Sequence, residues 1–457
     1  MFMETIYTPG IAHLSYILGD GGQAAVIDPR RDVEVYLEVA RREGAKITHV
    51  FETHRNEDYV IGSLELARRA GAEIYHGSQL DFKYGNPANE GDEFTLGDVK
   101  LSILHTPGHT MESISVVYRD LAFSDEPLGV FTGDALFIGD VGRTDFFPDR
   151  AEEVAGMLYD SIFHKLLPLG DHVVLWPAHG AGSVCGSGMA ERNFSTLGYE
   201  RKHNPALQKT DRGEFIRYKT SEDHFQPPYF RQMEKYNLEG APPLDELPRP
   251  KPLTPDEFAK AIDEGMLVID VRSPEAFASA HVPNSFSLPL EMLPAFAGMF
   301  LAYDKPLGLV VEDYRQIDEA LRGLIRIGYD NVDAFLAGGL HAWEKSGRHF
   351  DKVAAIHVAD LEERIDQGDG FTLLDVRSKD EFQSGHLRGA VPIYVGDLPS
   401  KLDQIPKERP VTTFCGSGQR AMVAAALLRR HGVEPVEDCF GSMSACKNVE
   451  CEVVNET

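Results

Sequence analysis

The chain has 457 residues, 42% of them apolar and 26% charged, which is an ordinary composition for a globular protein of about three domains. Its 45 basic and 72 acidic residues give a net charge of −27, and no lysine and arginine block is long enough to follow a phosphate backbone. This balance argues against nucleic acid and anionic membranes as partners. Because the sequence has no apolar run of about 18 residues and no signal-like N-terminus, we expect a cytoplasmic protein.

The cysteines stand at positions 185, 415, 439, 446 and 451. An odd number of cysteines in a long chain argues against a disulfide framework. A reducing compartment would also keep a reactive thiol in its free form. Cys446 and Cys451 are near enough in sequence to approach each other or Cys439. We nevertheless expect both to be unpaired.

Four apolar, strand-like runs in the first half of the chain each end in a motif that contains histidine or aspartate. The run 47–53 precedes the loop 54–59, and a helix is expected to begin near Gly62. The later motifs contain His109, Asp134 and His179. Loops that follow strands often carry metal ligands, so these four motifs predict a metal site.

The four motifs, in this order, resemble the metallo-β-lactamase superfamily over residues 1–240, and the resemblance implies an αββα sandwich. The superfamily's usual loop is His-x-His-x-Asp-His, which serves two metals, but Asn56 and Tyr59 replace two of its ligands here. His54, His109 and Asp134 are retained. In the superfamily's persulfide dioxygenases the iron ligands fall on these three positions, and two imidazoles with one carboxylate suit one Fe(II) per chain, with zinc as the alternative.

Other residues near these motifs have two possible roles. Asp58 and His179 belong to the superfamily's second metal position. Together with Asn56 and Tyr59, they are either a vestigial second metal site or, as we expect, residues that support the ligands by hydrogen bonds. Arg143, in a Gly-Arg-Thr-Asp-Phe stretch that resembles the dioxygenases, either orients the substrate or forms a structural salt bridge with Asp145.

Cys185 lies just after His179 in a stretch rich in glycine and serine, residues 180–188. It is either a second sulfur-handling thiol on a gating loop or an unreactive loop cysteine.

A proline-rich stretch at residues 241–255 predicts an extended linker, followed by a helix that begins at Thr254 and Pro255. Beyond it, the segment 268–283 contains Asp270, Arg272 and His281 and matches a later segment in order and spacing, which indicates an internal repeat. The loop that should carry a thiol in the first copy has no cysteine at residues 312–315. Residues 241–350 are therefore predicted to be an inactive scaffold domain.

Cys415 opens a loop between the apolar, strand-like run 411–414 and the helix-like segment 421–431. The loop residues cradle the sulfur with their backbone amides, and these are Gly416, Ser417, Gly418 and Gln419. The amides, the positive end of the helix and Arg420 would stabilise a thiolate or a persulfide on Cys415. The alternative is a buried structural cysteine.

With the segments 373–377 and 385–390, this loop resembles the rhodanese family over residues 351–457. The resemblance implies an α/β domain with a central parallel sheet, Cys415 as the catalytic thiol that carries sulfur, and Arg420 at the end of its loop. The whole chain is then expected to be α/β, with a metallo-β-lactamase sandwich followed by two rhodanese-like domains.

The two resemblances together imply an enzyme that oxidises a small thiol persulfide, such as glutathione persulfide, with O₂ at a mononuclear iron. The products are sulfite and thiol, and Cys415 transfers sulfur to sulfite or another acceptor, giving thiosulfate from sulfite. One alternative is a zinc-dependent thioester hydrolase similar to glyoxalase II. Another is a sulfurtransferase with a non-catalytic binding module. The thiol carrier and a homo-oligomeric state are left open.

Overall fold

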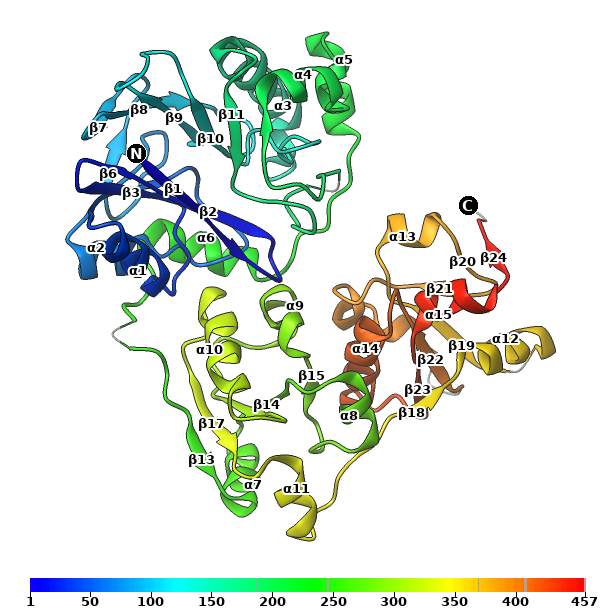
Figure 1. The fold of residues 1–457 in the computed structure, drawn as a ribbon. Coiled ribbons are helices and arrows are strands. Elements are labelled where there is room, and N and C mark those ends of the chain that lie inside the picture. The colour runs from blue at the N-terminus through cyan, green and yellow to red at the C-terminus, as the bar shows by residue number, and fades with distance from the viewer. Residues whose placement is uncertain (187, 245, 369, 407–408, 456–457) are drawn as a thin grey trace. The chain divides into compact units, whose positions relative to one another are not determined.

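The computed structural model describes residues 1–186, 188–244, 246–368, 370–406 and 409–455. They form two compact units, the first of Met1–Asp245 with Ile325–Gly328 and the second of Glu246–Leu324 with Tyr329–Thr457. Helices and strands mix in both units, which confirms the α/β class (Figure 1). Within the described ranges no helix is both long and apolar enough to cross a membrane. The domain boundaries expected at residues 240 and 350 stay predictions.

The first sheet of the first unit contains six strands that lie side by side in chain order. They are β1 (Phe2–Thr8), β2 (His13–Asp20), β3 (Gln23–Ile27), β4 (Lys46–Glu52), β5 (Glu73–Gly77) and β6 (Asn86–Ala88). The pairs among β1 to β3 are antiparallel, whereas β3 to β6 run parallel to one another. The strand predicted before the loop 54–59 is β4.

The second sheet also has six strands, again adjacent in chain order. They are β7 (Glu93–Leu96), β8 (Val99–His105), β9 (Ile114–Asp120), β10 (Gly129–Gly133), β11 (Val174–Pro177) and β12 (Ser195–Thr196). Only β10 and β11 pair in parallel, and their carboxyl ends carry the motifs of Asp134 and His179.

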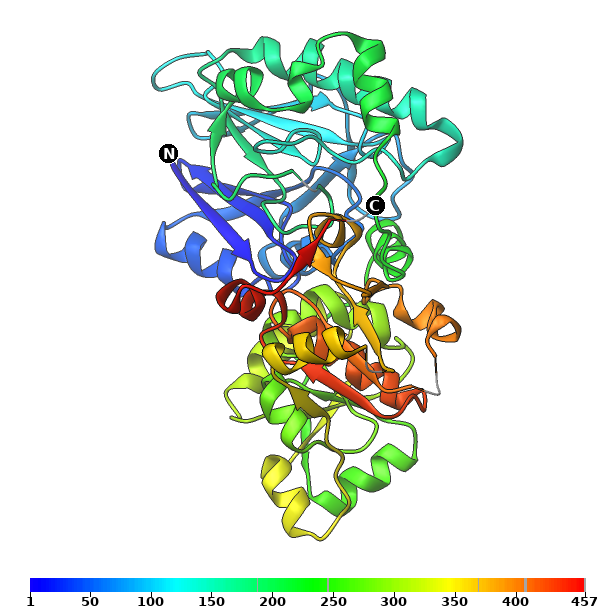
Figure 2. The ribbon, with the colours of Figure 1, turned by 90° about the vertical axis from the view of Figure 1, so that its right-hand side faces the viewer.

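The first unit has four layers, and a buried apolar cluster fills each of the three spaces between them. One cluster packs α1 (Glu34–Arg42) and α2 (Ser63–Ala70) on the first sheet, a second fills the space between the sheets, and a third packs α3, α4 and α5 on the second sheet. The remaining bounds are α3 (Ala151–Ser161), α4 (Leu197–His203), α5 (Arg212–Thr220) and α6 (Phe230–Glu239). Figure 2 shows the blue first sheet on one side and the cyan and green second sheet on the other. The predicted αββα sandwich is confirmed.

The second unit begins with a five-stranded, entirely parallel sheet in the order β13-β17-β16-β14-β15. Its strands are β13 (Lys251–Leu253), β14 (Leu267–Asp270), β15 (Phe286–Ser287), β16 (Leu307–Val310) and β17 (Val332–Leu336). Its helices are α7 (Pro255–Asp263), α8 (Pro274–Ser279), α9 (Leu293–Phe300), α10 (Gln316–Arg326) and α11 (Gly339–Lys345).

A second five-stranded parallel sheet has the order β18-β23-β22-β19-β21, which matches the first strand for strand. Its strands are β18 (Ala354–Ile356), β19 (Thr372–Asp375), β21 (Val391–Pro392), β22 (Val411–Phe414) and β23 (Val436–Cys439). Beside it lie α12 (Val358–Gln367), α13 (Lys379–Gln383), α14 (Gln419–Arg430), α15 (Ser442–Val449) and the antiparallel pair of β20 (His386–Leu387) and β24 (Val453–Val454). The internal repeat is therefore present in the topology.

The junction between linker and repeat differs slightly from the prediction. The helix start is confirmed, because the Thr254 hydroxyl and the Glu257 side chain form a capping box at the beginning of α7. The linker is shorter than expected, since Lys251–Leu253 already pairs with β17 as β13.

The expectation that Cys446 and Cys451 are unpaired is wrong in this structure. Helix α15 ends at Val449, and Glu450 takes a positive φ of 59° that turns the chain back. The amide of Cys451 then donates to the carbonyl of Cys446, and the two sulfurs form a disulfide. A local reversal that the composition did not indicate therefore brings the two side chains together.

Both repeats retain the same buried Asp-Arg pair. In the first, Asp270 accepts hydrogen bonds from Nε (2.8 Å) and Nη2 (2.6 Å) of Arg272, whose Nη2 also donates to the carbonyl of Ala280. In the second, Arg377 makes the equivalent bonds to Asp375 and to the carbonyl of Gly385. The pair clamps the end of a strand to the segment after the next helix.

The histidines of the repeats are equivalent as well. The rings of His281 and Phe277 stack with centroids 3.8 Å apart, and those of His386 and Phe382 do the same at 3.8 Å. Since the first copy has no thiol, the retention of its aspartate, arginine and histidine is explained by folding rather than by sulfur chemistry.

Replacing Asp270 with asparagine should destabilise the first repeat by about 3 kcal/mol, because the buried Arg272 guanidinium would lose its compensating charge. We expect a similar loss for Asp375→Asn in the second repeat and little change for Asp318→Asn, whose partner Arg322 forms an exposed pair. The hydrogen exchange rates of backbone amides in β14 and β16, measured at increasing urea concentrations, report the stability of the first repeat separately from that of the other domains. An effect of Asp270→Asn no larger than that of Asp318→Asn would contradict this role.

Candidate functional site

His54 follows β4 and is oriented by a chain of hydrogen bonds. The Thr53 hydroxyl donates to Asp28, at the end of β3, over 2.7 Å, and can therefore accept from Nδ1 of His54 at 2.9 Å. The backbone amide of Thr53 also donates to Asp28. Because Nδ1 carries the proton in this arrangement, the lone pair of Nε2 is left facing the site.

His109 and His179 are anchored in the same way. Nδ1 of His109 bonds to the carbonyl of Arg143 at 3.1 Å, so this nitrogen is the donor. Nδ1 of His179 lies 2.8 and 3.0 Å from the two carboxylate oxygens of Asp134. All three imidazoles thus use Nδ1 for positioning and present Nε2.

Asp134 follows Gly133, the last residue of β10, and lies among these imidazoles. Gly133 has a φ of 54°, and a Cβ there would lie 2.5 Å from the Thr53 hydroxyl, so a larger residue would not fit. Oδ2 of Asp134 is 3.7 Å from Nε2 of His54 and 3.5 Å from Nε2 of His109. Burial alone would raise the pKa of Asp134, but His179, His54 and His109 hold it well below its usual range.

The geometry fits a metal ion. Among the described residues, the Nε2 atoms of His54 and His109 are buried and have no hydrogen-bond partner. Ligand atoms that share one ion at about 2.0–2.2 Å lie about 3–4.4 Å apart, and the distances from Asp134 to His54 and His109 fall in this range. The structure therefore brings together His54, His109 and Asp134, the three predicted ligands. Their role as ligands stays a prediction.

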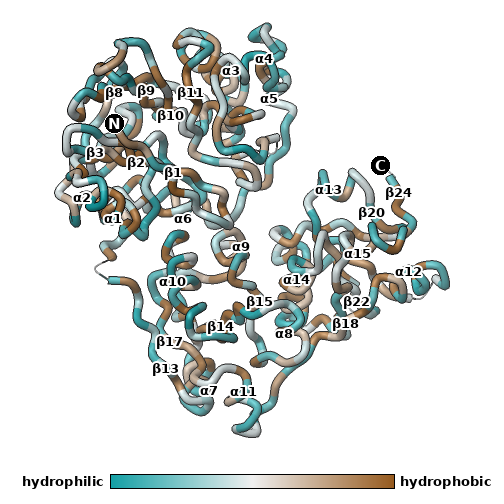
Figure 3. Tube along the Cα trace, viewed as in Figure 1, coloured by the Kyte–Doolittle hydropathy of each residue, from teal (hydrophilic) through white to brown (hydrophobic). Residues whose placement is uncertain are grey.

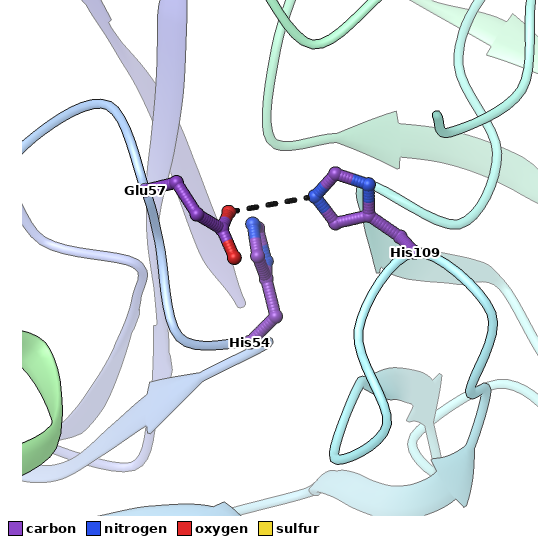
Figure 4. Close-up of side chains that lie close together, drawn as sticks. All are labelled: His54, Glu57 and His109. Carbon is purple, nitrogen blue, oxygen red and sulfur yellow. Dashed lines mark ion pairs between the residues drawn. The ribbon is translucent and has the colours of Figure 1, made fainter. Parts of the chain in front are cut away.

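Glu57 is a nearby residue that the sequence interpretation missed. Its carboxylate, with His54 and His109, forms a buried group whose ligand atoms all lie within 4.8 Å of one another. Figure 4 shows the carboxylate and the two imidazoles directed at one another. In the sequence it occupies a position that the superfamily's loop leaves unspecified, so only its acidic side chain inside a metal-binding loop could have indicated it.

The two residues that replace ligands in the usual loop turn away from the metal position. The side-chain amide of Asn56 donates to the backbone carbonyl of His54 over 3.1 Å. Tyr59 is buried against the His13 ring, with centroids 4.1 Å apart, and its hydroxyl bonds weakly to the carbonyl of Asp28 at 3.5 Å. Asn56 thus bonds to the backbone of a predicted ligand, whereas the contacts of Tyr59 are to His13 and Asp28, and the supporting roles of both residues stay predictions.

Asp58 lies on the opposite side of His179 from Asp134. Its Oδ2 is 3.1 Å from Nε2 of His179, and both of its carboxylate oxygens are buried without a hydrogen bond. His179 is thus held between two carboxylates. Burial would lower the pKa of His179, but Asp134 and Asp58 raise it well above the usual value.

Cys185 is buried, with 1% of its surface exposed. Its sulfur lies within 4.8 Å of ligand atoms of Asp58 and His179, and also within 4.8 Å of ligand atoms of His109 and Asp134. Burial raises the pKa of this thiol. The structure thus places Cys185 beside the metal position rather than on an exposed loop.

Arg143 is fully buried and its guanidinium is engaged by the protein. Nε and Nη2 donate to Asp145 at 2.7 and 2.6 Å, and Nη1 donates to the carbonyls of Val184 and Phe225. Burial would raise the pKa of Asp145, but Arg143 lowers it to about 2. These contacts favour the structural salt bridge over the substrate-orienting role.

The Cys415 loop has the predicted strand, loop and helix arrangement. Cys415 follows β22, its sulfur accepts a hydrogen bond from the amide of Gly418 at 3.1 Å, and its own amide donates to the Ser442 hydroxyl at 3.0 Å. Gly418 has a φ of 98° and precedes α14, while the carbonyl of Gly416 accepts from the amide of Ser444. Ser417 and Gln419 lie on either side of Gly418.

Arg420 is held at the loop by Glu381. Its Nη1 and Nη2 each donate to one carboxylate oxygen at 2.7 Å. Burial would raise the pKa of Glu381, but Arg420 lowers it to about 2, so this pair exists at neutral pH and is lost only as the pH falls toward 2.

The first repeat, which is predicted to be inactive, fills the corresponding loop differently. The amides of Glu312 and Asp313 both donate to the side-chain oxygen of Gln316, at 2.9 and 3.0 Å. A protein oxygen thus takes the amide hydrogen bonds in a loop that has no sulfur to cradle. This agrees with a scaffold role for the first copy.

Comparisons with known proteins identify the fold families. The metallo-beta-lactamase superfamily profile matches residues 8–179, and the rhodanese-like domain profile matches residues 254–346 and 357–448. A solved metallo-beta-lactamase structure from Staphylococcus aureus is 33% identical, covers 74% of this chain and 99% of its own, and superimposes with a TM-score of 0.67. This chain belongs to the metallo-β-lactamase superfamily. It carries two rhodanese-like domains after the superfamily domain.

The curated relatives of this superfamily member are named for two different activities. The mitochondrial persulfide dioxygenase ETHE1 of Mus musculus is 29% identical over 45% of this chain and 76% of its own length. The hydroxyacylglutathione hydrolase GloC of Haemophilus influenzae is 29% identical over 42% of this chain and 91% of its own length. Sequence identity alone does not separate these two activities.

Substitutions at the Arg420–Glu381 pair should move the reactivity of Cys415 in opposite directions. Arg420→Met removes the positive charge and should slow the alkylation of Cys415 at neutral pH, because a nearby cation favours an anionic sulfur. Glu381→Gln leaves Arg420 unneutralised and should speed the alkylation. Mass spectrometry of the Cys415 peptide after iodoacetamide treatment measures both, with Arg388→Met, at an exposed arginine of the same domain, as control. Rate changes of the same sign in the two variants would contradict the electrostatic account.

Proposed function

We propose that this chain oxidises the persulfide of a low-molecular-weight thiol with O₂ and transfers sulfane sulfur through Cys415. In the first reaction RSSH, O₂ and H₂O give RSH and sulfurous acid, which ionises to sulfite. His54, His109 and Asp134 would hold one iron ion. When bound, iron supplies the redox chemistry that activates O₂.

The observation that carries the proposal is the selective retention of one ligand set. His54, His109 and Asp134 present unhindered ligand atoms at distances that suit one ion, whereas Asn56 and Tyr59 are bonded or packed elsewhere. Two imidazoles and one carboxylate leave coordination positions open, as non-haem Fe(II) oxygenases require. The similarity to a persulfide dioxygenase supports the same chemistry.

The protein's own residues would set the ligands in place before a substrate arrives. Asp28 and Thr53 fix the ring of His54, the carbonyl of Arg143 fixes His109, and His179 fixes Asp134. Because each ligand is oriented by a buried partner, little reorganisation is needed on binding.

Sulfur transfer at Cys415 would follow a simple exchange. The Cys415 thiolate takes the terminal sulfur of a persulfide, which breaks the donor's S–S bond and releases the donor thiolate. Sulfite then attacks that sulfur, a new S–S bond forms, and thiosulfate leaves while the Cys415 thiolate is restored. The amide of Gly418 and the charge of Arg420 would stabilise the anionic sulfur throughout.

A second candidate is a zinc-dependent thioester hydrolase, which the similarity to GloC favours. Such enzymes in this superfamily use the full His-x-His-x-Asp-His loop. The replacement of two of its ligands by Asn56 and Tyr59 weighs against it. A sulfurtransferase with a non-catalytic metal-binding module would show activity at Cys415 alone.

Single substitutions should separate the two activities. In iron-loaded protein with glutathione persulfide, we expect Asp134→Ala to abolish O₂ uptake and Cys415→Ser to leave it intact while eliminating thiosulfate formation. Asp125→Ala, at an exposed aspartate of the same domain, should change neither activity. An O₂ electrode and thiosulfate chromatography give both rates. Undiminished O₂ uptake in Asp134→Ala, or zinc-dependent hydrolysis of a glutathione thioester without O₂ uptake, would refute the dioxygenase.

A further inference from the structure

The carboxylate of Glu57 lacks any hydrogen bond in the described structure. Its side chain is fully buried, and neither of its two oxygens has a hydrogen-bond partner. A buried carboxylate is costly unless a cation or several donors compensate it. The position of Glu57 therefore requires an explanation that its protein contacts alone do not provide.

The nearest cationic side chain is only a partial explanation. Nη2 of Arg55 is 3.7 Å from Oε1 of Glu57, beyond hydrogen-bond distance, and the same atom donates to Glu234 at 3.0 Å. The backbone amide of Arg55 donates to Glu112 and not to Glu57. Arg55 is thus committed elsewhere, and the other face of the Glu57 carboxylate is directed at imidazole nitrogens.

The distances on that face are those of ligands around one ion. Oε2 of Glu57 is 3.7 Å from Nε2 of His109, which is itself 3.5 Å from Oδ2 of Asp134. The ligand atoms of His54, Glu57 and His109 all lie within 4.8 Å of one another (Figure 4). Nε2 of His109 thus has one carboxylate oxygen from Asp134 and one from Glu57, each at a distance that suits two ligands of one ion.

We propose that Glu57 is a fourth protein ligand of the ion held by His54, His109 and Asp134. It takes the place of the histidine that Asn56 replaces in the superfamily's loop, one residue further along the chain. Asn56 does not compete, because its amide is bonded to the carbonyl of His54. The inference rests on the metal site of the proposed function and not on the reaction catalysed there.

A second carboxylate changes what the site can hold. Two neutral imidazoles and two carboxylates balance the charge of a divalent cation, whereas one carboxylate leaves a net positive charge. Oxygen ligands also favour harder ions such as Fe(II) and Mn(II). In a six-coordinate ion, four protein ligands leave two positions for other molecules.

Metal affinity tests the proposal without any turnover. We would titrate metal-free protein with Co²⁺ in competition with a chromophoric chelator. Glu57→Gln, which keeps the shape and removes the charge, should weaken Co²⁺ binding by about 10-fold or more. Glu52→Gln should remain within about two-fold of the parent chain. Glu52 is a matched control, because it is an equally buried glutamate whose carboxylate instead accepts from Tyr84.

A crystal structure of the Co²⁺-loaded parent chain distinguishes a ligand from a nearby charge and requires no variant. We expect an oxygen of Glu57 within about 2.3 Å of the ion. An oxygen more than about 3.5 Å away, or Co²⁺ affinity of Glu57→Gln within two-fold of the parent, would overturn the inference. Tight Co²⁺ binding that depends on Glu57, in a protein that takes up no O₂ when loaded with iron, would defeat the proposed function and leave the inference standing.

Discussion

The buried carboxylate of Asp134 among three imidazoles is the interaction on which the rest of the first unit depends. A carboxylate with negligible solvent access is tolerable only if positive or proton-donating groups compensate it. Nδ1 of His179 donates to Asp134, and an ion held between Asp134 and the Nε2 atoms of His54 and His109 would supply the rest of the compensation. Each imidazole is contributed by a different loop. The loop that carries Asp134 and the three loops that carry the histidines must therefore meet at one place for this arrangement to form.

The backbone enforces that meeting by linking the two sheets at their ends. The amide of Ile114 donates to the carbonyl of Thr53, the amide of Ala178 donates to that of Gly133, and the amide of Leu14 donates to that of Ala178. The first and the third of these bonds tie the first sheet to the second, and the bond between Ala178 and Gly133 joins the ends of β10 and β11 within the second sheet. The apolar layers hold the sheets together, and Figure 3 shows the hydrophobic colour along β9 and β10, the strands that lead into this region.

The tandem repeats separate the residues that both copies share from those around the thiol of the second copy. Both copies keep the clamp of aspartate and arginine and the histidine stacked on phenylalanine. Only the second copy has a thiol, an arginine held by a glutamate and an amide directed at sulfur. In the first, Gln316 occupies the amides of the loop. The fold therefore persists without the thiol loop, because the clamp does not include the residues of that loop.

Much of the fold could be predicted from the sequence, because the motifs that indicate it consist of residues adjacent in the chain. Strand β4, the helix start at Thr254 and the strand and helix around Cys415 all depend on contiguous residues. The predictions were less complete where distant segments meet. The burial of Cys185 and the carbonyls of Val184 and Phe225 that hold Arg143 come from packing between loops far apart in sequence. The turn at Glu450 and the direction of the Glu57 side chain depend on single backbone conformations that composition does not specify.

The most direct test of the central claim is the ratio of sulfite formed to O₂ consumed by the iron-loaded chain with glutathione persulfide. The Cys415→Ser background is suitable, because it prevents sulfite from being drawn into thiosulfate. Oxidation of sulfane sulfur at the site of Asp134 predicts one sulfite for each O₂. Oxygen consumption without sulfite, or no consumption by a chain that carries iron, would contradict the account.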